Sequence, residues 1–359
     1  MIKKNSILIG DSLNILKKIP DNSVDLIFAD PPYNLQLKDT LYRPDQTTVE
    51  AVTEYWDKFN TYKDYDNFSE KWLKESKRIL KKGGALWVIG SYHNILRVGT
   101  IIQNFGFWIL NDIIWNKTNP MPNFRGTRFT NAHETLLWCT TSRNAKYTFN
   151  YQNLKELNDG KQMRSDWYIP ICSGKERLRE NNKQRSHPTQ KPESLLYRVI
   201  LSTTNKGDTI LDPFLGSGTT AVVAKKLQRN FIGIERDKKY IRLSKNRLKN
   251  TKVLEDNVLS VTKSRKDLPK VPFGELVEQG IIPPGAVLTD KKEKFKAIVT
   301  VDGSIKINDI SGSIHQVGAK LQNLPSCNGW DYWHLKNKSS STLLDNVRDN
   351  YRSKKTSLN

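Results

Sequence analysis

Short apolar segments of strand length alternate with helical patterns from the start of this chain to about residue 250. The clearest is VDLIFA at residues 24–29, which is apolar enough for a strand buried on both faces. This alternation predicts an α/β fold with an open, mostly parallel sheet and helices on both faces. The predicted strands are residues 6–9, 24–29, 85–89, 108–115, 134–140, 209–213 and 231–235. The predicted helices are residues 13–19, 67–80 (stopped by Gly83 and Gly84), 192–202 and 219–227.

The composition also predicts how the chain is divided. Residues 1–250 carry the alternating pattern, which two polar segments interrupt: about 36–66, which is too long for an ordinary connection, and about 142–190, which lacks a core pattern. Residues 251–270 are charged and typical of a linker. Residues 271–336 predict a small β-rich module, with a type I′ hairpin turn at Asp302-Gly303. Residues 337–359 are polar and predict a flexible tail.

The net charge of +21 favours a polyanionic partner, above all nucleic acid, because such a surplus repels itself in a folded protein. A generally lysine-rich proteome is the alternative explanation. A membrane surface is less expected, since no long apolar run is present. The three cysteines, Cys139, Cys172 and Cys327, lack metal-site spacing and fit a reducing cytosol. The pair His133-Glu134 lacks the second histidine of a zinc-protease helix, because Leu137 occupies its place.

A first motif, Asp30-Pro31-Pro32-Tyr33, directly follows the buried strand VDLIFA. The two prolines stiffen the loop, which presents a carboxylate, a carbonyl and an aromatic ring at the end of a strand. Asp30 and the Pro31 carbonyl can accept N–H bonds from an amino group on a flat base, while Tyr33 stacks on that base. The motif therefore predicts catalysis by positioning and electrostatics on an exocyclic amine. A proline-rich strand end with a capping aspartate is the alternative.

A second motif, DPFLGSG at residues 212–218, follows the strand at 209–211 and precedes a helix. Its glycines allow a ligand to approach the backbone at the helix amino terminus. Glu235 ends the next strand and is placed to bind ribose hydroxyls. A dinucleotide site would look similar, but a dehydrogenase gives no reason for the Asp-Pro-Pro-Tyr loop.

These two motifs together resemble those of DNA methyltransferases that modify exocyclic amines. The order, with Asp30 ahead of Asp212, is similar to the β class. Segments such as NPMPNF, RFTNAHETLLW and HPTQKPESLLYRVI resemble the cell-cycle-regulated (CcrM) and HinfI-type adenine modification methylases over nearly the whole chain. The resemblance implies a Rossmann-like methyltransferase sheet with permuted motif order, S-adenosylmethionine as cofactor, and no metal, since a sulfonium donor is already activated.

The resemblance also implies roles for particular residues. The catalytic loop would be Asp30, Pro31, Pro32 and Tyr33. The methionine end of the cofactor would lie near Thr189 and Lys191, its adenine near Asp11, and its ribose near Glu235. The rest of the implied cofactor site is the loop after the second strand: Asp212, Phe214, Gly216, Ser217, Gly218 and Thr219.

Neither motif reaches a base inside a duplex, so the target adenine is expected to be flipped out of double-stranded DNA. Candidate target-recognition segments are 36–66 and 119–190, especially the basic stretches 41–56, 119–128 and 161–185. Aromatic candidates for stacking or wedging are Trp56, Phe124 and Trp167, although local core is the commoner role for such residues. The cluster Trp330, Tyr332, Trp333 and His334 is either a DNA-binding surface or the core of the small module. The basic helix pattern at 237–250 is either a phosphate-facing wall or a solvated face.

Several alternatives remain at the level of function. An inactive DNA reader would have lost part of the two motifs, and methyltransferases of RNA or of protein glutamine place an Asn-Pro-Pro-Tyr loop after the cofactor motif. A cytosine-amine DNA methyltransferase is the nearest alternative. The resemblance implies GANTC as the site, and a restriction–modification role with a partner endonuclease or a cell-cycle role. A homodimer is also consistent with the class.

Overall fold

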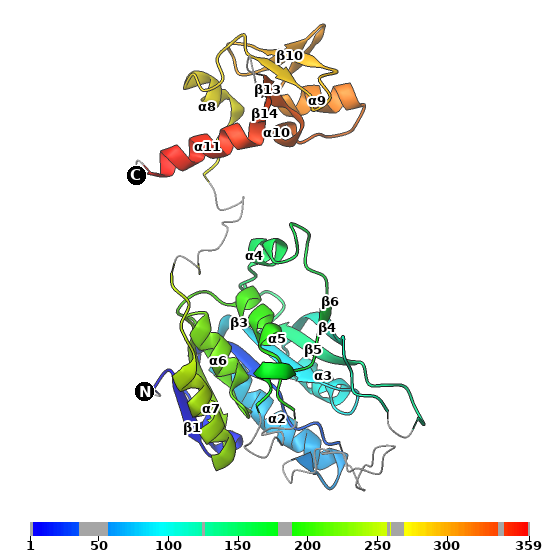
Figure 1. Cartoon of the computed structure of the whole chain (residues 1–359), viewed down its shortest axis with the longest axis vertical. Coiled ribbons are helices and arrows are strands. Elements are labelled where there is room, and N and C mark those ends of the chain that lie inside the picture. Colours follow the sequence, from blue (N-terminus) through cyan, green and yellow to red (C-terminus); the bar gives the residue numbers. More distant parts are fainter. Residues whose placement is uncertain are drawn as a thin grey trace. The chain divides into compact units, whose positions relative to one another are not determined.

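The computed structural model describes residues 3–35, 57–123, 126–178, 189–256, 259, 269–336 and 341–357. The chain forms two compact units, Met1–Thr262 and Lys263–Asn359, and each has its own hydrophobic core (Figure 1). The predicted segments 41–56 and 179–185, with Trp56 and Phe124, lie outside the described residues. None of the helices in the described part of the chain carries an apolar stretch long enough to cross a membrane.

The first unit is built on one eight-stranded sheet in the order β1-β8-β7-β2-β3-β5-β4-β6. Among these described strands only β5 runs against the others, because it pairs antiparallel with both β3 and β4 while the remaining pairs are parallel. The predicted mostly parallel α/β sheet is confirmed. The strands are β1 (Ser6–Ile9), β2 (Val24–Ala29), β3 (Leu80–Gly90), β4 (Trp108–Lys117), β5 (His133–Thr140), β6 (Asp166–Ile169), β7 (Thr209–Asp212) and β8 (Asn230–Glu235).

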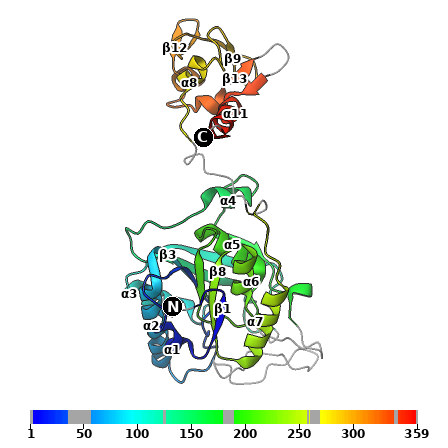
Figure 2. The same ribbon diagram turned by 90° about the vertical axis from the view of Figure 1, so that its left-hand side faces the viewer.

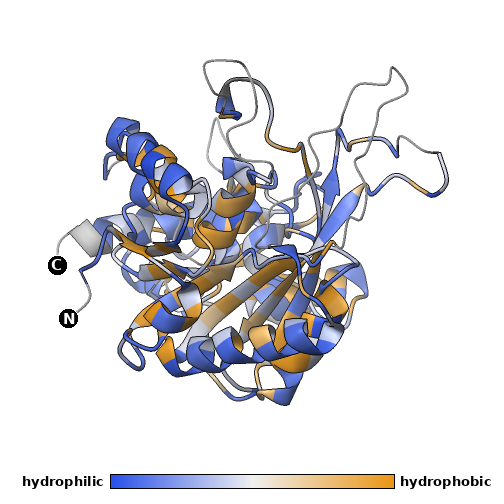
Figure 3. Cartoon of the chain, turned by 90° about the horizontal axis from the view of Figure 1, so that it is seen from below, coloured by the Kyte–Doolittle hydropathy of each residue, from blue (hydrophilic) through white to orange (hydrophobic). Residues whose placement is uncertain are grey.

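Helices cover both faces of this sheet, because alternate residues of its central strands point to opposite sides. In β2, Ile27 and Ala29 join the core on one face, while Leu26 and Phe28 join the other. Figure 2 shows α1, α2 and α3 on one side of the strands and α5, α6 and α7 on the other, and Figure 3 shows the apolar strands between their polar outer surfaces. The helices are α1 (Ser12–Leu16), α2 (Tyr62–Ile79), α3 (Ile95–Asn104), α4 (Tyr151–Glu156), α5 (Glu193–Thr203), α6 (Thr219–Lys226) and α7 (Lys238–Asn250).

The glycine pair after α2 has a different role from the predicted one. The helix ends at Ile79, and Gly83 and Gly84 lie within β3. Gly83 has a φ of +77°, and a Cβ there would lie 1.8 Å from the carbonyl oxygen of Lys146. The pair is therefore needed for close approach of two backbones rather than to stop a helix.

The polar segment at 142–190 contributes to the core, contrary to the prediction from its composition. Its strand β6 extends the sheet by pairing with β4, and Trp167 and Ile169 from β6 are buried. The Trp167 ring packs against Trp87, with 6.0 Å between the ring centroids. Trp167 is thus a core residue and not a wedge for DNA.

The second unit folds around a six-stranded antiparallel sheet in the order β12-β11-β10-β9-β13-β14. Trp330 and Trp333 are buried in its core, as the core interpretation predicts. Its strands are β9 (Val287–Thr289), β10 (Lys296–Val299), β11 (Ile305–Ile307), β12 (Ile310–Gly312), β13 (His334–Lys336) and β14 (Ser341–Leu343). Its helices are α8 (Phe273–Glu278), α9 (Ile314–Gln322), α10 (Gly329–Tyr332) and α11 (Leu344–Ser357).

Two sequence expectations for this unit differ from the structure. The hairpin joins β10 to β11 as expected, but Gly303 alone of its turn pair has a positive φ, so the turn is not type I′. Much of the predicted flexible tail is the helix α11. It is held because Leu344 is buried in the core and the Arg348 guanidinium lies 4.1 Å from the centre of the Trp330 ring.

Candidate functional site

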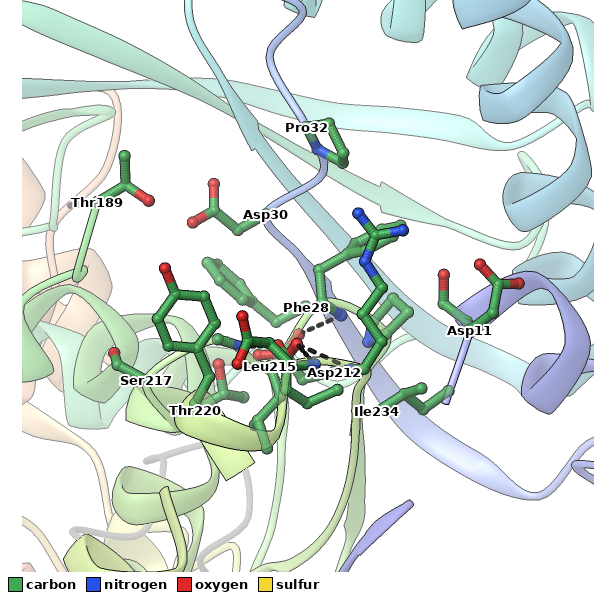
Figure 4. Close-up of a pocket in the computed structure, with 18 of the residues that line it drawn as sticks. Asp11, Phe28, Asp30, Pro32, Thr189, Asp212, Leu215, Ser217, Thr220 and Ile234 are labelled. Carbon is green, nitrogen blue, oxygen red and sulfur yellow. Dashed lines mark hydrogen bonds between the residues drawn. The ribbon is translucent and has the colours of Figure 1, made fainter. Parts of the chain in front are cut away.

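A cavity of about 610 Å³ opens where β2, β7 and β8 end, at the carboxyl edge of the sheet. In Figure 4, Asp30 and Thr189 lie on one side of it, Asp11 on the other and Asp212 between them. Of the predicted site residues, Pro31, Tyr33 and Gly218 are not among those that line the cavity. Those that line it are Asp11, Asp30, Pro32, Thr189, Lys191, Asp212, Phe214, Gly216, Ser217, Thr219 and Glu235.

The loop of residues 30–35, here called the proline loop, is held by a carboxylate from a distant part of the chain. Asp57 is buried, and its oxygens accept three successive backbone N–H groups, from Tyr33 at 2.6 Å, Asn34 at 2.9 Å and Leu35 at 3.0 Å. These bonds stabilise Asn34 at a φ of +55°, a conformation that few residues adopt. The Tyr65 hydroxyl donates to the carbonyl of Pro32 at 2.8 Å. The loop therefore has one defined conformation at the edge of the cavity.

Charged side chains from three further elements meet the proline loop. The Lys191 ammonium lies 2.7 Å from Oδ2 of Asp30 and 3.7 Å from Oε2 of Glu134. The Tyr33 hydroxyl donates to the same Oε2 of Glu134 at 2.8 Å. The Lys117 ammonium lies 2.8 Å from Oε1 of Glu134. Two cations and two carboxylates thus form a balanced, largely buried network around Tyr33.

Burial and neighbouring charges set the protonation of this network. Burial raises the pKa of Asp30 above its ordinary value, although Lys191 acts against the rise. Burial also raises the pKa of Tyr33 well above its ordinary value, and the charges of Asp30 and Glu134 raise it further. Burial opposes ionisation of Glu134, but Lys191 and Lys117 outweigh it and hold the pKa of Glu134 below its usual range. The phenol is therefore neutral and Glu134 is ionised.

The second motif, here called the glycine loop (residues 212–219), has a conformation that depends on its glycines and on side chains that bind its backbone groups. Gly216 and Gly218 have φ values of +50° and +81°, which only glycine adopts readily. Glu235 accepts the N–H of Gly216 at 2.8 Å with one oxygen. Its other oxygen accepts the N–H groups of Arg236 and Asp237, both at 2.8 Å. Glu235 therefore fixes the loop and also lines the cavity.

Gly218 lies against α7, which explains why no larger residue fits there. A Cβ on Gly218 would lie 2.8 Å from the Cβ of Ser244. The Ser244 hydroxyl donates to the carbonyl of Gly216 at 2.8 Å, and Arg247 donates to the carbonyl of Ser217 at 2.8 Å. The basic helix pattern at 237–250 thus has a structural role on the side that faces the glycine loop.

Two aspartates at the cavity have different environments. Asp212 is buried, and burial raises its pKa to about 7, against the hydrogen bonds it accepts from Thr220 and from the N–H of Phe214. Asp11 is more exposed and caps α1 by accepting the N–H of Asn14 at 3.2 Å. Near neutral pH, Asp212 is thus poised between its two protonation states at the floor of the site.

Sequence reasoning missed Glu134, Lys117 and Asp57 as parts of this site. Glu134 follows from the strand direction: because β5 runs against its neighbours, its first residues lie at the edge where the other strands end. The sequence carried a signal, a Glu at the polar start of an apolar strand. Asp57 carries no comparable signal, because 22 residues separate it from Leu35, which it holds.

The loop between β4 and β5, part of the predicted recognition segment 119–190, carries exposed aromatic and basic side chains. In the loop between β4 and β5, the Phe129 side chain is 98% exposed and the Arg128 guanidinium donates to the Tyr92 hydroxyl at 3.2 Å. This loop precedes Glu134, so exposed aromatic and basic groups adjoin the strand that reaches the site. The described residues include no cluster of three or more His, Cys, Asp or Glu side chains placed to hold a metal ion.

Comparison with known proteins gives consistent findings. A family model described as DNA methylase matches residues 24–246, and one described as Restriction Enzyme Adenine Methylase Associated matches residues 255–357. The chain is 50% identical to the Type II methyltransferase M.HinfI of Haemophilus influenzae over 347 residues, covering 97% of this chain and 96% of that protein.

Two further similarities cover the first unit. The Type II methyltransferase M2.LlaDCHI of Lactococcus lactis subsp. cremoris is 43% identical over 248 residues, covering 68% of this chain and 90% of that protein. Among solved structures, the cytosine-N4-specific PvuII DNA methyltransferase matches with a TM-score of 0.54 at 23% identity, covering 72% of this chain and 89% of that one. The structural match supports the fold of the first unit.

Proposed function

The chain belongs to the DNA methylase family and is a HinfI-type DNA methyltransferase that uses S-adenosylmethionine, and we propose that it methylates the N6 amine of adenine in double-stranded DNA. The observation that carries the choice of an exocyclic amine is the juxtaposition of the proline and glycine loops. Asp30 and Pro32 line the same cavity as Phe214 and Gly216, so an acceptor for an amine faces the site of a methyl donor.

In the proposed reaction, Asp30 and the Pro31 carbonyl each accept a hydrogen bond from one of the two N–H groups of the amine. This draws the nitrogen lone pair out of conjugation with the ring, while Tyr33 stacks on the base. Bound S-adenosylmethionine would supply a methyl group from its positively charged sulfur: the N–CH3 bond forms as the S–CH3 bond breaks, and the electron pair of the broken bond would leave with the sulfur as neutral S-adenosylhomocysteine. The transfer leaves an additional proton on the nitrogen, and Asp30 is its nearest proposed acceptor. The chain contributes positioning and electrostatic stabilisation rather than a covalent nucleophile.

The cavity fits the cofactor in size and in the order of its polar groups. Acidic side chains, Asp11 and Glu235, lie at the edge formed by β1 and β8, where they would accept hydrogen bonds from the hydroxyl and amino groups of a nucleoside. We assign the methionine end to Thr189, Lys191 and the amino terminus of α6, whose N–H groups suit a carboxylate. We assign the contacts with the part of the cofactor between its nucleoside and methionine ends to Asp212, Phe214, Gly216, Ser217, Gly218 and Thr219.

The target base is proposed to reach Asp30 by flipping out of the duplex, since a stacked base is inaccessible to a carboxylate inside a cavity. The net charge of +21 supports a DNA partner. We assign target recognition to the segments at 36–66 and 119–190, and a contribution to DNA binding to the second unit, residues 271–336, beyond the linker at 251–270. The recognition sequence GANTC is proposed from the resemblance to HinfI-type methylases. A restriction–modification role with a partner endonuclease and a homodimeric state are proposed on the same ground.

The test uses labelled S-adenosylmethionine and duplex oligonucleotides that differ only by a GANTC site, followed by nucleoside analysis. We expect label in N6-methyladenine with the GANTC duplex and none with the matched duplex. Label in N4-methylcytosine would contradict adenine as the target, and equal label in both duplexes would contradict the recognition sequence.

A further inference from the structure

Glu134 lies at the centre of the charged network although neither sequence motif contains it. One of its oxygens is engaged by Lys117 at 2.8 Å. The other accepts the Tyr33 hydroxyl at 2.8 Å and lies 3.7 Å from the Lys191 ammonium. Its side chain is only 11% exposed. Because a carboxylate oxygen can accept more than one hydrogen bond, Oε2 of Glu134 can also bind the Lys191 ammonium.

Lys191 binds the carboxylate of Asp30 that the proposed reaction requires to be available to the target amine. Its ammonium lies 2.7 Å from Oδ2 of Asp30, on the carboxylate that must accept the target amine. The Lys191 side chain is 9% exposed, so it cannot simply leave Asp30 and be hydrated. Breaking a buried ion pair by removing one partner carries a large energetic penalty, because the other charge is left buried and unpaired. A second carboxylate within reach removes most of that penalty.

We propose that Glu134 is a positioning residue that acts as the alternative counter-ion of Lys191, receiving its ammonium when the target amine reaches Asp30. The inference rests on the function proposed for Asp30. The displacement needed is short, because Oε2 of Glu134 is already 3.7 Å from the ammonium. The backbone of Lys191 stays in place, since its carbonyl accepts the Thr219 hydroxyl at 3.2 Å. Only the side chain moves, from the carboxylate of Asp30 to that of Glu134.

The proposal predicts a specific defect in Glu134→Gln. The amide keeps the shape and an oxygen acceptor for the Tyr33 hydroxyl but removes the charge, so Lys191 stays on Asp30. We expect kcat for DNA methylation to fall roughly 100-fold, comparable to the cost of a misplaced catalytic group, while the Kd for S-adenosylmethionine stays within about twofold. The matched control is Glu70→Gln, on the exposed face of α2, which should keep wild-type turnover.

Tyr33→Phe separates the two partners of Glu134. It removes the hydroxyl that Glu134 accepts but leaves the charge relationship with Lys191 intact. We expect a smaller loss than in Glu134→Gln, and a further loss when Glu134→Gln is added to Tyr33→Phe. If Glu134 served only to anchor Tyr33, the single variants would lose equally and the double variant would lose no more.

The pH dependence provides a readout that a packing role would not change. Asp30 must be ionised to accept the amine, and it faces Lys191, Glu134, Tyr33, Asp57 and Asp212. The negative charge of Glu134 raises the pKa of Asp30. Removing that charge lowers the pKa of Asp30, so the acidic limb of kcat in Glu134→Gln should move to lower pH than in wild type and in Tyr33→Phe.

The outcomes distinguish the inference from the function on which it rests. Wild-type turnover in Glu134→Gln, an unmoved acidic limb, or loss of S-adenosylmethionine binding would overturn the role of Glu134. Asp30→Ala serves as the inactive reference. If Asp30→Ala transferred methyl groups as fast as the wild type, the function proposed for Asp30 would fail, and the inference would fail with it.

Discussion

The proline loop and the glycine loop leave neighbouring strands of one sheet, but they are held in different ways. The proline loop depends on side chains from far along the chain: Asp57 binds its amides, Tyr65 its carbonyl, and Lys191 its carboxylate. The glycine loop depends on glycines with positive φ values and on side chains of β8 and α7 that bind its backbone groups: Glu235, Ser244 and Arg247. The two loops face the same cavity.

The difference indicates how each loop is expected to respond to its surroundings. A loop fixed by its glycines and by contacts to its backbone groups is a constant binding site. A loop fixed by remote carboxylates and cations can be rearranged when a ligand competes for one of them, as proposed for Lys191. We infer that cofactor binding is the rigid part of this site and that base capture is the adjustable part.

The largest expected effect is on the glycine loop, where Gly218→Val introduces a side chain at a φ of +81° and against Ser244. Strain of this kind costs about 1–3 kcal/mol before the steric clash is counted. We expect the Kd for S-adenosylmethionine, measured by calorimetry, to rise roughly 100-fold. Ala319→Val, in the second unit, is the matched change outside this loop. An unchanged Kd in Gly218→Val would contradict the rigidity of the glycine loop.

An intermediate effect is expected from Asp57→Asn, which weakens the hold on the proline loop alone. The amide keeps one oxygen, which can still accept the N–H groups of Tyr33 and Asn34, but its NH₂ group faces the N–H of Leu35 in place of the second oxygen. We expect kcat to fall roughly tenfold, since a misplaced catalytic group costs up to about 100-fold, with S-adenosylmethionine binding unchanged. A matching loss of cofactor affinity would show that the conformations of the two loops depend on each other, and would contradict the distinction drawn between them.

The smallest effect concerns Asp212, whose pKa is raised to about 7 by burial. Between the ordinary pKa of an aspartate and about 7, the unfolded chain is ionised while the native carboxyl is protonated, so the free energy of unfolding falls as pH rises through that window. Asp212→Asn removes this dependence. Relative to wild type, the variant should gain on the order of 1 kcal/mol between pH 6 and pH 7, measured by denaturant unfolding without cofactor. A constant difference across that range would contradict the raised pKa.

The sequence was sufficient to predict the sheet and the positions of both loops. The reason is local: VDLIFA is buried on both faces in β2, and the glycines of the second motif lie in the loop between β7 and α6. Asp30 and Asp212 follow adjacent strands, and each could be placed at a strand end from its own segment.

What the sequence did not predict depends on contacts between distant segments. Glu134 reaches the site only because β5 runs against its neighbours, and strand direction is a property of the whole sheet. Trp167 lies in a polar, arginine-rich segment, yet β6 pairs with β4 and buries it. Likewise α11 has a mostly polar sequence, and Leu344 and the contact of Arg348 with Trp330 bind it to a core formed by other elements.

The pairing of β2 with β7 also bears on how such enzymes diversify. Leu26 and Ile27 pair with Ile210 and Leu211, although about 180 residues lie between the two strands. The intervening chain therefore leaves the centre of the sheet and returns to the adjacent position. Genetic exchange with break points in these two strands would replace the whole excursion while keeping β1, β7 and β8. Such an exchange would replace the proline loop, Thr189 and Lys191 together with the proposed recognition segments, and would keep only the glycine-loop side of the cofactor site.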